Sequence, residues 1–164
     1  MKWPFRQRSL EDLGAHALSA SHAQAMADIH AQTFKPSWTD GEFADLLSRE
    51  NVGGVALSEQ ATDGGAMLGF ALVRITGDEA EILTVAVTPK WQNYGLGRRL
   101  MDMVLANLHA DRISKLFLEV DEGNQAAVAL YRNVGFEQVA VRKNYYSGDE
   151  GQKSHALVMR RDVG

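Results

Sequence analysis

The sequence predicts a single α/β (α+β) domain, built on a mixed, mostly antiparallel sheet of about seven strands with helices on both faces. Three strand-like segments, 52–58, 67–76 and 81–87, follow one another through short turns. Such an arrangement is typical of an antiparallel meander. An amphipathic helix then separates segment 81–87 from the apolar segment 115–120. A helix between two strands implies a right-handed crossover, so we expect one parallel pair in the sheet.

The composition is that of an ordinary globular protein, with 45% hydrophobic and 23% charged residues among 164. We expect residues 13–164 to form one domain and residues 1–12 an N-terminal extension. Neither a secretory signal nor an apolar run long enough to span a bilayer is visible, which favours a cytoplasmic protein without a membrane partner. The absence of cysteine excludes disulfides, thiolate metal sites and a cysteine nucleophile.

The charge and the histidines narrow the function further. A net charge of −4 argues against broad nucleic-acid binding and favours a cationic acceptor such as an amine. The five histidines show no metal-ligand spacing, so we expect surface or structural roles for them and no metal.

Two short helices are expected before the meander. Ser21 is a suitable N-cap for a helix over 22–34, which Pro36 closes. Thr39 and Glu42 have the spacing of a capping box at the start of a second helix.

After the crossover, Asn124 is expected to cap a helix over 125–133, and Gly135 to end it. The other expected elements are strands at 13–19, 136–142 and 156–160, a turn at 62–65 and a polar loop at 146–155.

The segment between the predicted parallel strands carries the strongest functional signal. The strand ends at Pro89, and the following helix starts with Gly95 and Gly97 in its first turn. A glycine inside a helix costs about 1 kcal/mol relative to alanine, so two of them suggest that something approaches the backbone closely. The free N–H groups of a helix start, together with Arg98 and Arg99, favour a phosphate or pyrophosphate.

Several phosphate-loop patterns compete for this segment. The P-loop pattern fails because Gly97 is followed by arginine and not by Lys-Ser/Thr. The dinucleotide fingerprint needs a third glycine where Leu100 stands, although Glu119 lies where a ribose-binding acid would be. The pattern Gln-x-x-Gly-x-Gly is met by Gln92, Gly95 and Gly97. The plain alternative is a glycine-rich turn without a ligand.

At Gln92, Gly95 and Gly97 the chain resembles the GNAT superfamily of N-acetyltransferases. In that superfamily this loop and helix cradle the pyrophosphate of acetyl-coenzyme A, and the order of elements is the one predicted here. The resemblance therefore implies the GNAT fold, with the parallel pair around the acetyl-CoA site. The segment from Asn124 through Tyr131 to Gly135-Phe136 is similar to the superfamily's second motif, in which the tyrosine faces the coenzyme sulfur.

A narrower resemblance is to the ribosomal-protein alanine N-acetyltransferases of the RimI type, from about Leu18 to Met159. It is carried by Phe117-Leu118-Glu119-Val120, Asn124, Ala129-Leu130-Tyr131, Gly135-Phe136 and Arg142-Lys143-Asn144-Tyr145-Tyr146. It implies transfer from acetyl-CoA to the N-terminal alanine of a small-subunit ribosomal protein, in a ternary complex. The coenzyme contacts that the resemblance implies are Val85, Ala86, Val87, Gln92, Asn93, Tyr94, Gly95, Leu96, Gly97, Arg98 and Asn124.

The resemblance assigns the catalytic base to Glu119 and the acid to Tyr131. Glu119 stands in an otherwise apolar strand, and burial would raise the pKa of its carboxyl toward neutrality, as a base requires. Its plain interpretation is a solvent-facing or salt-bridged strand residue. The plain interpretation of Tyr131 is core packing. Glu81 is a rival for the base, because many superfamily members place theirs on the preceding strand.

The sequence says less about the acceptor amine. The loop around Trp38 resembles the family's first helix–helix loop, which helps form the acceptor site, and one of Tyr145 and Tyr146 is expected to reach that cleft. Ser154-His155 stand where the family commonly carries an acidic pair, which leaves the acceptor open. The alternatives are a lysine side chain or small-molecule amine as acceptor, a non-catalytic acetyl-CoA-binding module and, more distantly, a dinucleotide-dependent oxidoreductase.

Overall fold

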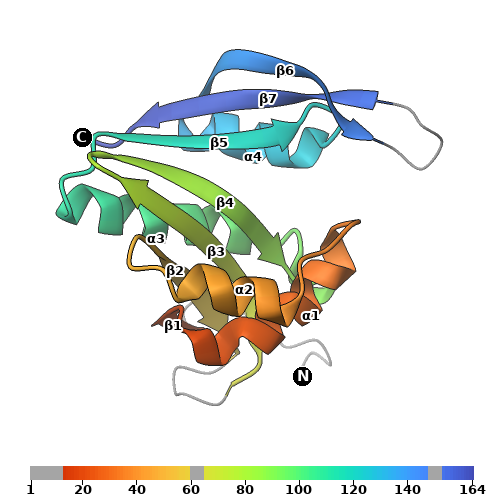
Figure 1. Ribbon diagram of the computed structural model, residues 1–164, viewed down its shortest axis with the longest axis vertical. Helices are drawn as coiled ribbons and strands as arrows, with labels where there is room; N and C mark the ends of the chain where they lie inside the picture. The colour runs from red at the N-terminus through yellow and green to blue at the C-terminus, as the bar shows by residue number, and fades with distance from the viewer. Residues whose placement is uncertain (1–12, 60–64, 148–152) are drawn as a thin grey trace, which may run out of the picture.

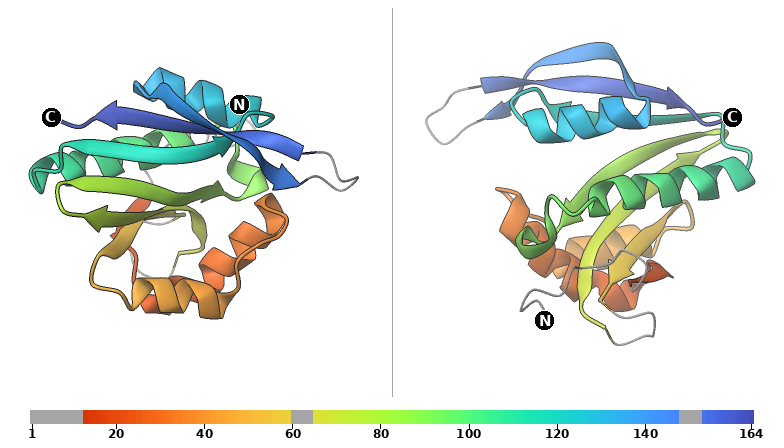
Figure 2. Two further views of the ribbon diagram at one scale, coloured as in Figure 1. Left: turned by 45° about the horizontal axis from the view of Figure 1, so that its top comes forward. Right: turned by 180° about the vertical axis from the view of Figure 1, so that it is seen from behind.

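The computed structural model describes residues 13–59, 65–147 and 153–164. Within these ranges one seven-stranded sheet has the order β1-β2-β3-β4-β5-β7-β6 and carries helices on both faces (Figure 1, Figure 2). The strands are β1 (Gly14–Ala17), β2 (Val52–Ser58), β3 (Met67–Thr76), β4 (Glu79–Val87), β5 (Lys115–Asp121), β6 (Glu137–Ser147) and β7 (Lys153–Asp162). The helices are η2 (Ala20–His22), α1 (Ala23–Thr33), α2 (Asp40–Leu47), η3 (Pro89–Trp91), α3 (Leu96–Ala110) and α4 (Gln125–Val134).

The sheet confirms the predicted meander and crossover. Strands β1 to β4 pair antiparallel in sequence, β4 and β5 pair parallel across α3, and β5, β7 and β6 pair antiparallel. The N-terminal extension and most of the predicted 62–65 turn lie outside the described residues.

Two cores cover the two faces of the sheet. Behind the sheet as drawn in Figure 1, α3 packs on β2, β3 and β4 and beside α4, and the two helices contribute Leu100, Val104 and Val134 to the core on that side. In front, α1 and α2 pack Met26 and Phe43 against β2, β3 and β4. Side chains of β2, β3 and β4 therefore enter both cores, as the two-residue period of a strand allows.

The helix caps show where local sequence rules hold. The capping box is confirmed, because the Glu42 N–H donates to Thr39 Oγ1 at 3.1 Å and the Thr39 N–H donates to Glu42 Oε2 at 3.2 Å. The Asn124 side chain accepts from the Ala127 N–H at 3.2 Å, and Gly135 ends α4 with φ 102°.

Two boundary predictions are wrong. Ser21 does not cap the helix, because it lies within the 3₁₀ turn η2, whose N-cap is Ser19 with an extended backbone. The N-cap of α1 itself is His22, which makes no side-chain cap hydrogen bond. The predicted polar loop at 146–155 is shorter, since β6 continues to Ser147 and β7 begins at Lys153. Polar side chains do not prevent pairing on a strand as exposed as β6, which lies at the edge of the sheet.

The feature that shapes the site is a β-bulge in β4. Leu72 of β3 lies opposite Thr84 and Val73 lies opposite Ile82, so Leu83 is an extra residue in β4. A bulge bends its strand and increases the local twist. Strand β4 pairs with β5 only over Glu79–Glu81, just before the bulge, and the two strands then separate (Figure 1).

Candidate active site

Beyond Glu81, the separation of β4 from β5 leaves an opening between the two strands, and one edge of β4 faces it. The Thr88 N–H donates to the Leu68 carbonyl at 2.8 Å, so this part of β4 bonds to β3 through alternate residues. By that alternation the N–H groups of Val85 and Val87 point toward β5, and the ladder between β4 and β5 stops at Glu81. Within the described ranges, no strand takes up these two donors. They are placed to meet an extended ligand that carries carbonyl groups.

The loop after β4 is tied back to that strand. The Gln92 side chain donates to the Val87 carbonyl at 3.1 Å. Asn93 and Gly95 both have positive φ, of 67° and 84°, and Gly95 is the N-cap of α3. Glycine has no side chain with which to cap the helix, so the first N–H groups of α3 remain available to an anion.

Gly97, the second glycine of the helix start, lies against a side chain of α4. A Cβ atom at Gly97 would lie 3.0 Å from Leu130 Cδ2 of α4. The glycine at this position therefore allows α4 to approach α3 closely. Leu96, between the two glycines, is buried in the core behind the sheet.

The two arginines of this helix start differ in their surroundings. Arg98 donates to Asp102 Oδ1 at 3.2 Å and to the Asn133 carbonyl at 3.3 Å, which joins α3 to the end of α4. The Nε atom of Arg99 is buried and has no hydrogen-bond partner among the described residues. Tyr94 is 49% exposed, with its ring centroid 5.8 Å from that of Trp91.

Glu119 lies on the α1–α2 face of the sheet, because Leu118 and Val120 on either side enter the core behind it. Its side chain is 22% exposed and forms an ion pair with Arg142, with Oε1 and Nε 3.0 Å apart. The carboxylate is therefore half-buried and salt-bridged, rather than enclosed by apolar side chains as expected. It lies two residues beyond the last β5 residue that pairs with β4.

Glu81, the rival carboxylate, lies in the closed part of the sheet, opposite Phe117 of β5. Its Oε2 atom is 2.7 Å from Arg74 Nη2 on the neighbouring strand. Glu119 thus borders the opening between the strands, whereas Glu81 lies where they are still paired. The geometry favours Glu119.

Tyr131 is 9% exposed and belongs to the core behind the sheet, with its ring centroid 5.8 Å from that of Phe136. Glu119 and Tyr131 therefore lie on opposite faces of the sheet, on two consecutive elements, β5 and α4. Asn124 serves as the cap of α4. The side chains of Tyr145 and Tyr146 lie outside those that the structure describes.

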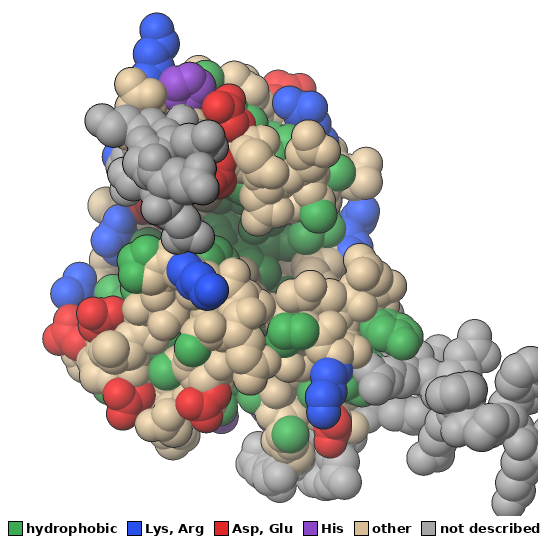
Figure 3. Space-filling model, turned by 90° about the vertical axis from the view of Figure 1, so that its right-hand side faces the viewer, with side chains coloured by type: hydrophobic (Ala, Val, Ile, Leu, Met, Phe, Trp, Pro, Cys, Tyr) green, Lys and Arg blue, Asp and Glu red, His purple; other side chains and the backbone are tan. Residues whose placement is uncertain are grey.

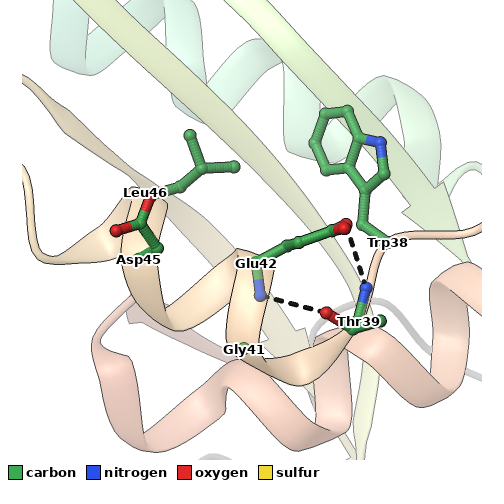
Figure 4. A pocket seen from close by; sticks show the side chains of 6 residues that line it. All are labelled: Trp38, Thr39, Gly41, Glu42, Asp45 and Leu46. Carbon is green, nitrogen blue, oxygen red and sulfur yellow. Dashed lines mark hydrogen bonds between the residues drawn. The ribbon is translucent and has the colours of Figure 1, made fainter.

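A pocket of about 550 Å³ lies on the α1–α2 face and is lined by Trp38, Thr39, Gly41, Glu42, Asp45 and Leu46 (Figure 4). The Trp38 indole extends from the loop between α1 and α2, above Glu42 as drawn. Seen toward the ends at which β4 and β5 diverge, the molecule is hollowed, with hydrophobic side chains in the depth of the hollow (Figure 3).

The sequence did not single out His30, which contacts Trp38. Its side chain is 2% exposed, and burial lowers the pKa of the imidazole to about 4, although the charge of Glu42 acts in the opposite direction. The structural role expected of the histidines is thus realised here. The available signal was its position on the apolar side of α1, next to Ile29.

His155, at the position that departs from the family pattern, makes hydrogen bonds to residues of neighbouring segments. Its Nδ1 accepts from the N–H of Asn144, whose φ is 57°, and its own N–H donates to Glu122 Oε1 at 3.3 Å. It therefore ties together the ends of β5, β6 and β7. Among the described residues, no group of three His, Asp or Glu side chains has the arrangement of a metal site, and none of the described helices meets the length and hydropathy of a membrane span.

Comparison with known proteins identifies relatives along most of the chain. The model of the acetyltransferase (GNAT) family matches residues 23–136. The [ribosomal protein bS18]-alanine N-acetyltransferase of Escherichia coli (strain K12) is 36% identical over 143 residues, which cover 87% of this chain and 93% of that protein. The N-alpha-acetyltransferase RimI of Mycobacterium tuberculosis (strain H37Rv) is 38% identical over 159 residues, which cover 90% of this chain and 91% of that protein.

Solved structures give the same result. The crystal structure of the ribosomal-protein-S18-alanine N-acetyltransferase from Escherichia coli superposes with a TM-score of 0.83 at 30% identity, over 93% of this chain and 94% of that chain. The fold class and the family resemblance predicted from the sequence are confirmed.

Proposed function

Because the chain belongs to the acetyltransferase (GNAT) family, we propose that this N-acetyltransferase transfers the acetyl group of acetyl-CoA to the N-terminal alanine of a small-subunit ribosomal protein. The observation that carries the proposal is the separation of β4 from β5 beside the uncapped start of α3. It provides a strand edge for the pantetheine amides and a helix terminus for the pyrophosphate. The acceptor is proposed from the names of the similar proteins.

The coenzyme side would be held mainly by backbone groups. The N–H groups of the α3 start and the buried Nε of Arg99 offer donors and positive charge to the pyrophosphate. The loop Asn93–Arg98 would wrap it. The N–H groups of Val85 and Val87 would bind the pantetheine and the thioester oxygen, and Val87 would stabilise the negative charge that develops there.

The reaction would take place between the two faces of the sheet. The amine enters from the α1–α2 face, where Glu119 accepts its proton through a water molecule. The nitrogen then bonds to the acetyl carbon and the carbon–sulfur bond breaks. Tyr131, from the opposite face, gives its phenolic proton to the departing thiolate and regains one from solvent. Holding the two substrates together supplies much of the acceleration.

Location and partners follow from the proposed acceptor. An enzyme that acetylates a ribosomal protein acts where ribosomes are assembled, so we place it in the cytoplasm, with acetyl-CoA and a protein N-terminus as its partners. The chemistry requires neither a metal nor direct contact with nucleic acid or a membrane.

A second class of acceptor is a lysine side chain or a small amine. It is considered because His155 stands where the family commonly carries an acidic residue, next to the proposed acceptor site. A lysine side chain or a small amine would use the same coenzyme site and the same base. An N-terminal amine is attached to the α-carbon of a peptide, whereas a lysine amine is at the end of an alkyl chain. Peptides that carry only one of these amines distinguish the two classes.

The test measures thiol release from acetyl-CoA with two matched peptides. One has a free N-terminal alanine and no lysine; the other has a blocked N-terminus and one internal lysine. Release with the alanine peptide alone supports the proposal. Release with the lysine peptide alone overturns the N-terminal acceptor and leaves the family activity intact. Release with neither, despite coenzyme binding, favours a small-molecule acceptor or a binding module.

A further inference from the structure

We propose that His30 is a positioning residue for the acceptor: it fixes the loop between α1 and α2, and with it Trp38, against β4 beside the Val85 and Val87 edge. The proposal rests on the proposed function, because it concerns the acceptor side of that reaction. Among the described residues, the hydrogen bonds and ring contacts of the His30 side chain are made with Phe34, Trp38, Phe43 and Thr84, and it has no part in the proton transfers described above.

The imidazole is held by two directed hydrogen bonds. Its Nδ1 accepts from the Trp38 N–H at 3.0 Å, so that nitrogen carries no proton. The proton of the neutral ring therefore lies on Nε2, which donates to Thr84 Oγ1 at 3.2 Å. One ring thus joins α1, the loop and β4.

Aromatic rings enclose the same imidazole. Phe34 and Trp38 stack on it, with centroid distances of 4.3 and 5.1 Å and interplanar angles of 18° and 25°. Phe43 of α2 meets it edge-on at 5.3 Å. The stack sets the orientation of the Trp38 ring, and the hydrogen bond sets the position of its backbone.

These contacts lie next to the proposed reaction centre. Thr84 directly precedes Val85, whose N–H faces the opening between β4 and β5. At the other end of that edge, Thr88 donates to the Gln32 side chain of α1 at 3.3 Å. The carboxyl end of α1 is therefore hydrogen-bonded on both sides of the Val85–Val87 segment, at Thr84 in β4 and at Thr88 directly after it.

Trp38 transmits the position of His30 to the acceptor side. It lines the pocket on the α1–α2 face, together with Glu42 and Asp45 (Figure 4). Glu119 lies on that same face. A shift of Trp38 would therefore change the wall that an acceptor meets and leave the α3 start in place.

A pair of substitutions separates the two hydrogen bonds. His30→Asn places an amide oxygen near the position of Nδ1 and keeps an acceptor for the Trp38 N–H. His30→Gln reaches toward Thr84 and leaves that N–H without its acceptor. We expect His30→Gln to raise the KM for the acceptor peptide about tenfold, as the loss of one partner of a half-buried hydrogen bond would. We expect His30→Asn to retain most of the acceptor affinity, and both variants to keep the KM for acetyl-CoA.

His109→Gln is the matched control, because it makes the same change at an exposed histidine near the end of α3. It should leave both KM values unchanged. Equal rises in both KM values for His30→Gln, or a loss of thermal stability with an unchanged acceptor KM, would mean a purely structural role and overturn the proposal. If the unaltered enzyme prefers another amine, the proposed acceptor fails, and the same comparison is made with that amine.

A second measurement does not depend on the acceptor. The chain has three tryptophans, so Trp3→Phe and Trp91→Phe together leave Trp38 as the sole emitter. Iodide quenching of its fluorescence should increase in His30→Gln and change little in His30→Asn. If the enzyme acetylates no amine at all, the proposed function fails, and unchanged quenching in His30→Gln overturns the inference on its own.

Discussion

At the scale of residues, the two candidate bases on the α1–α2 face are each paired with an arginine. Glu119 pairs with Arg142 at the opening, and Glu81 pairs with Arg74 where the strands are joined. Both carboxylates thus have the same kind of cationic partner. Their positions relative to the opening between β4 and β5, and not their partners, therefore distinguish the two candidates.

Glu119→Gln should lower kcat by about 10²- to 10⁴-fold, the usual contribution of a general base, with little change in the KM for acetyl-CoA. Glu81→Gln is the control, since it removes a carboxylate on the same face but in the paired part of the sheet. Steady-state kinetics with the acceptor amine decide the question. A loss of turnover in Glu81→Gln together with normal turnover in Glu119→Gln would move the base to Glu81.

The buried His30 predicts a pH dependence of stability. Its pKa is lowered from 6.5 to about 4, so between these values the unfolded state binds more protons than the folded one. The free energy of unfolding should therefore fall as the pH drops from about 6.5 to about 4, by at most about 3 kcal/mol from this group. Burial lowers the pKa of His30 more than the opposing charge of Glu42 raises it, so the sign of this effect is set by burial.

Urea unfolding at several pH values, with His30→Asn beside the unaltered protein, measures this contribution. The variant should be less stable near pH 7 and should lose less stability on acidification. Parallel curves for the two proteins would show that His30 does not titrate in this window.

At the scale of elements, the start of α3 depends on the backbone freedom of Gly95. Its φ of 84° is left-handed, which costs an alanine about 1–2 kcal/mol. Gly95→Ala should therefore lower stability by about that amount and weaken acetyl-CoA binding, because the first N–H groups of the helix would be displaced.

Gly97→Ala is the matched comparison. Its new Cβ meets only the end of a flexible leucine side chain, so this substitution should disturb coenzyme binding less. Calorimetric titration with acetyl-CoA measures both variants. An equal loss of affinity would mean that helix–helix spacing, and not the left-handed cap, controls the site.

At the scale of the whole molecule, the sheet is held in two parts. The β4–β5 ladder joins them only over Glu79–Glu81, and beyond the Leu83 bulge the two strands separate. A ligand that lies between these strands would take the place of the missing ladder. The fold thus leaves its weakest strand contact where the proposed coenzyme binds.

Acetyl-CoA at about 100 times its dissociation constant should accordingly stabilise the protein by about 2.7 kcal/mol. For a chain of this size, that corresponds to a rise of about 5–10 °C in Tm. Differential scanning fluorimetry with acetyl-CoA, and with the acceptor peptide alone as the control, tests this expectation. An unchanged Tm in saturating acetyl-CoA would contradict a coenzyme site between β4 and β5.

The sequence by itself determined the order of the elements, the bounds of β2 and β3, the caps Thr39 and Asn124, and the family. These features depend on hydrophobic periodicity, on side chains that bond within three residues, and on motifs that are contiguous in the chain.

Only the tertiary structure decided how the site is assembled. The bulge at Leu83 depends on the register between two strands, and a register is not written in either strand alone. Arg142 reaches Glu119, and Thr84 reaches His30, from far along the chain. Such pairs form when packing brings distant elements together, so no local pattern shows that Glu119 is salt-bridged or that His30 holds Trp38 in place.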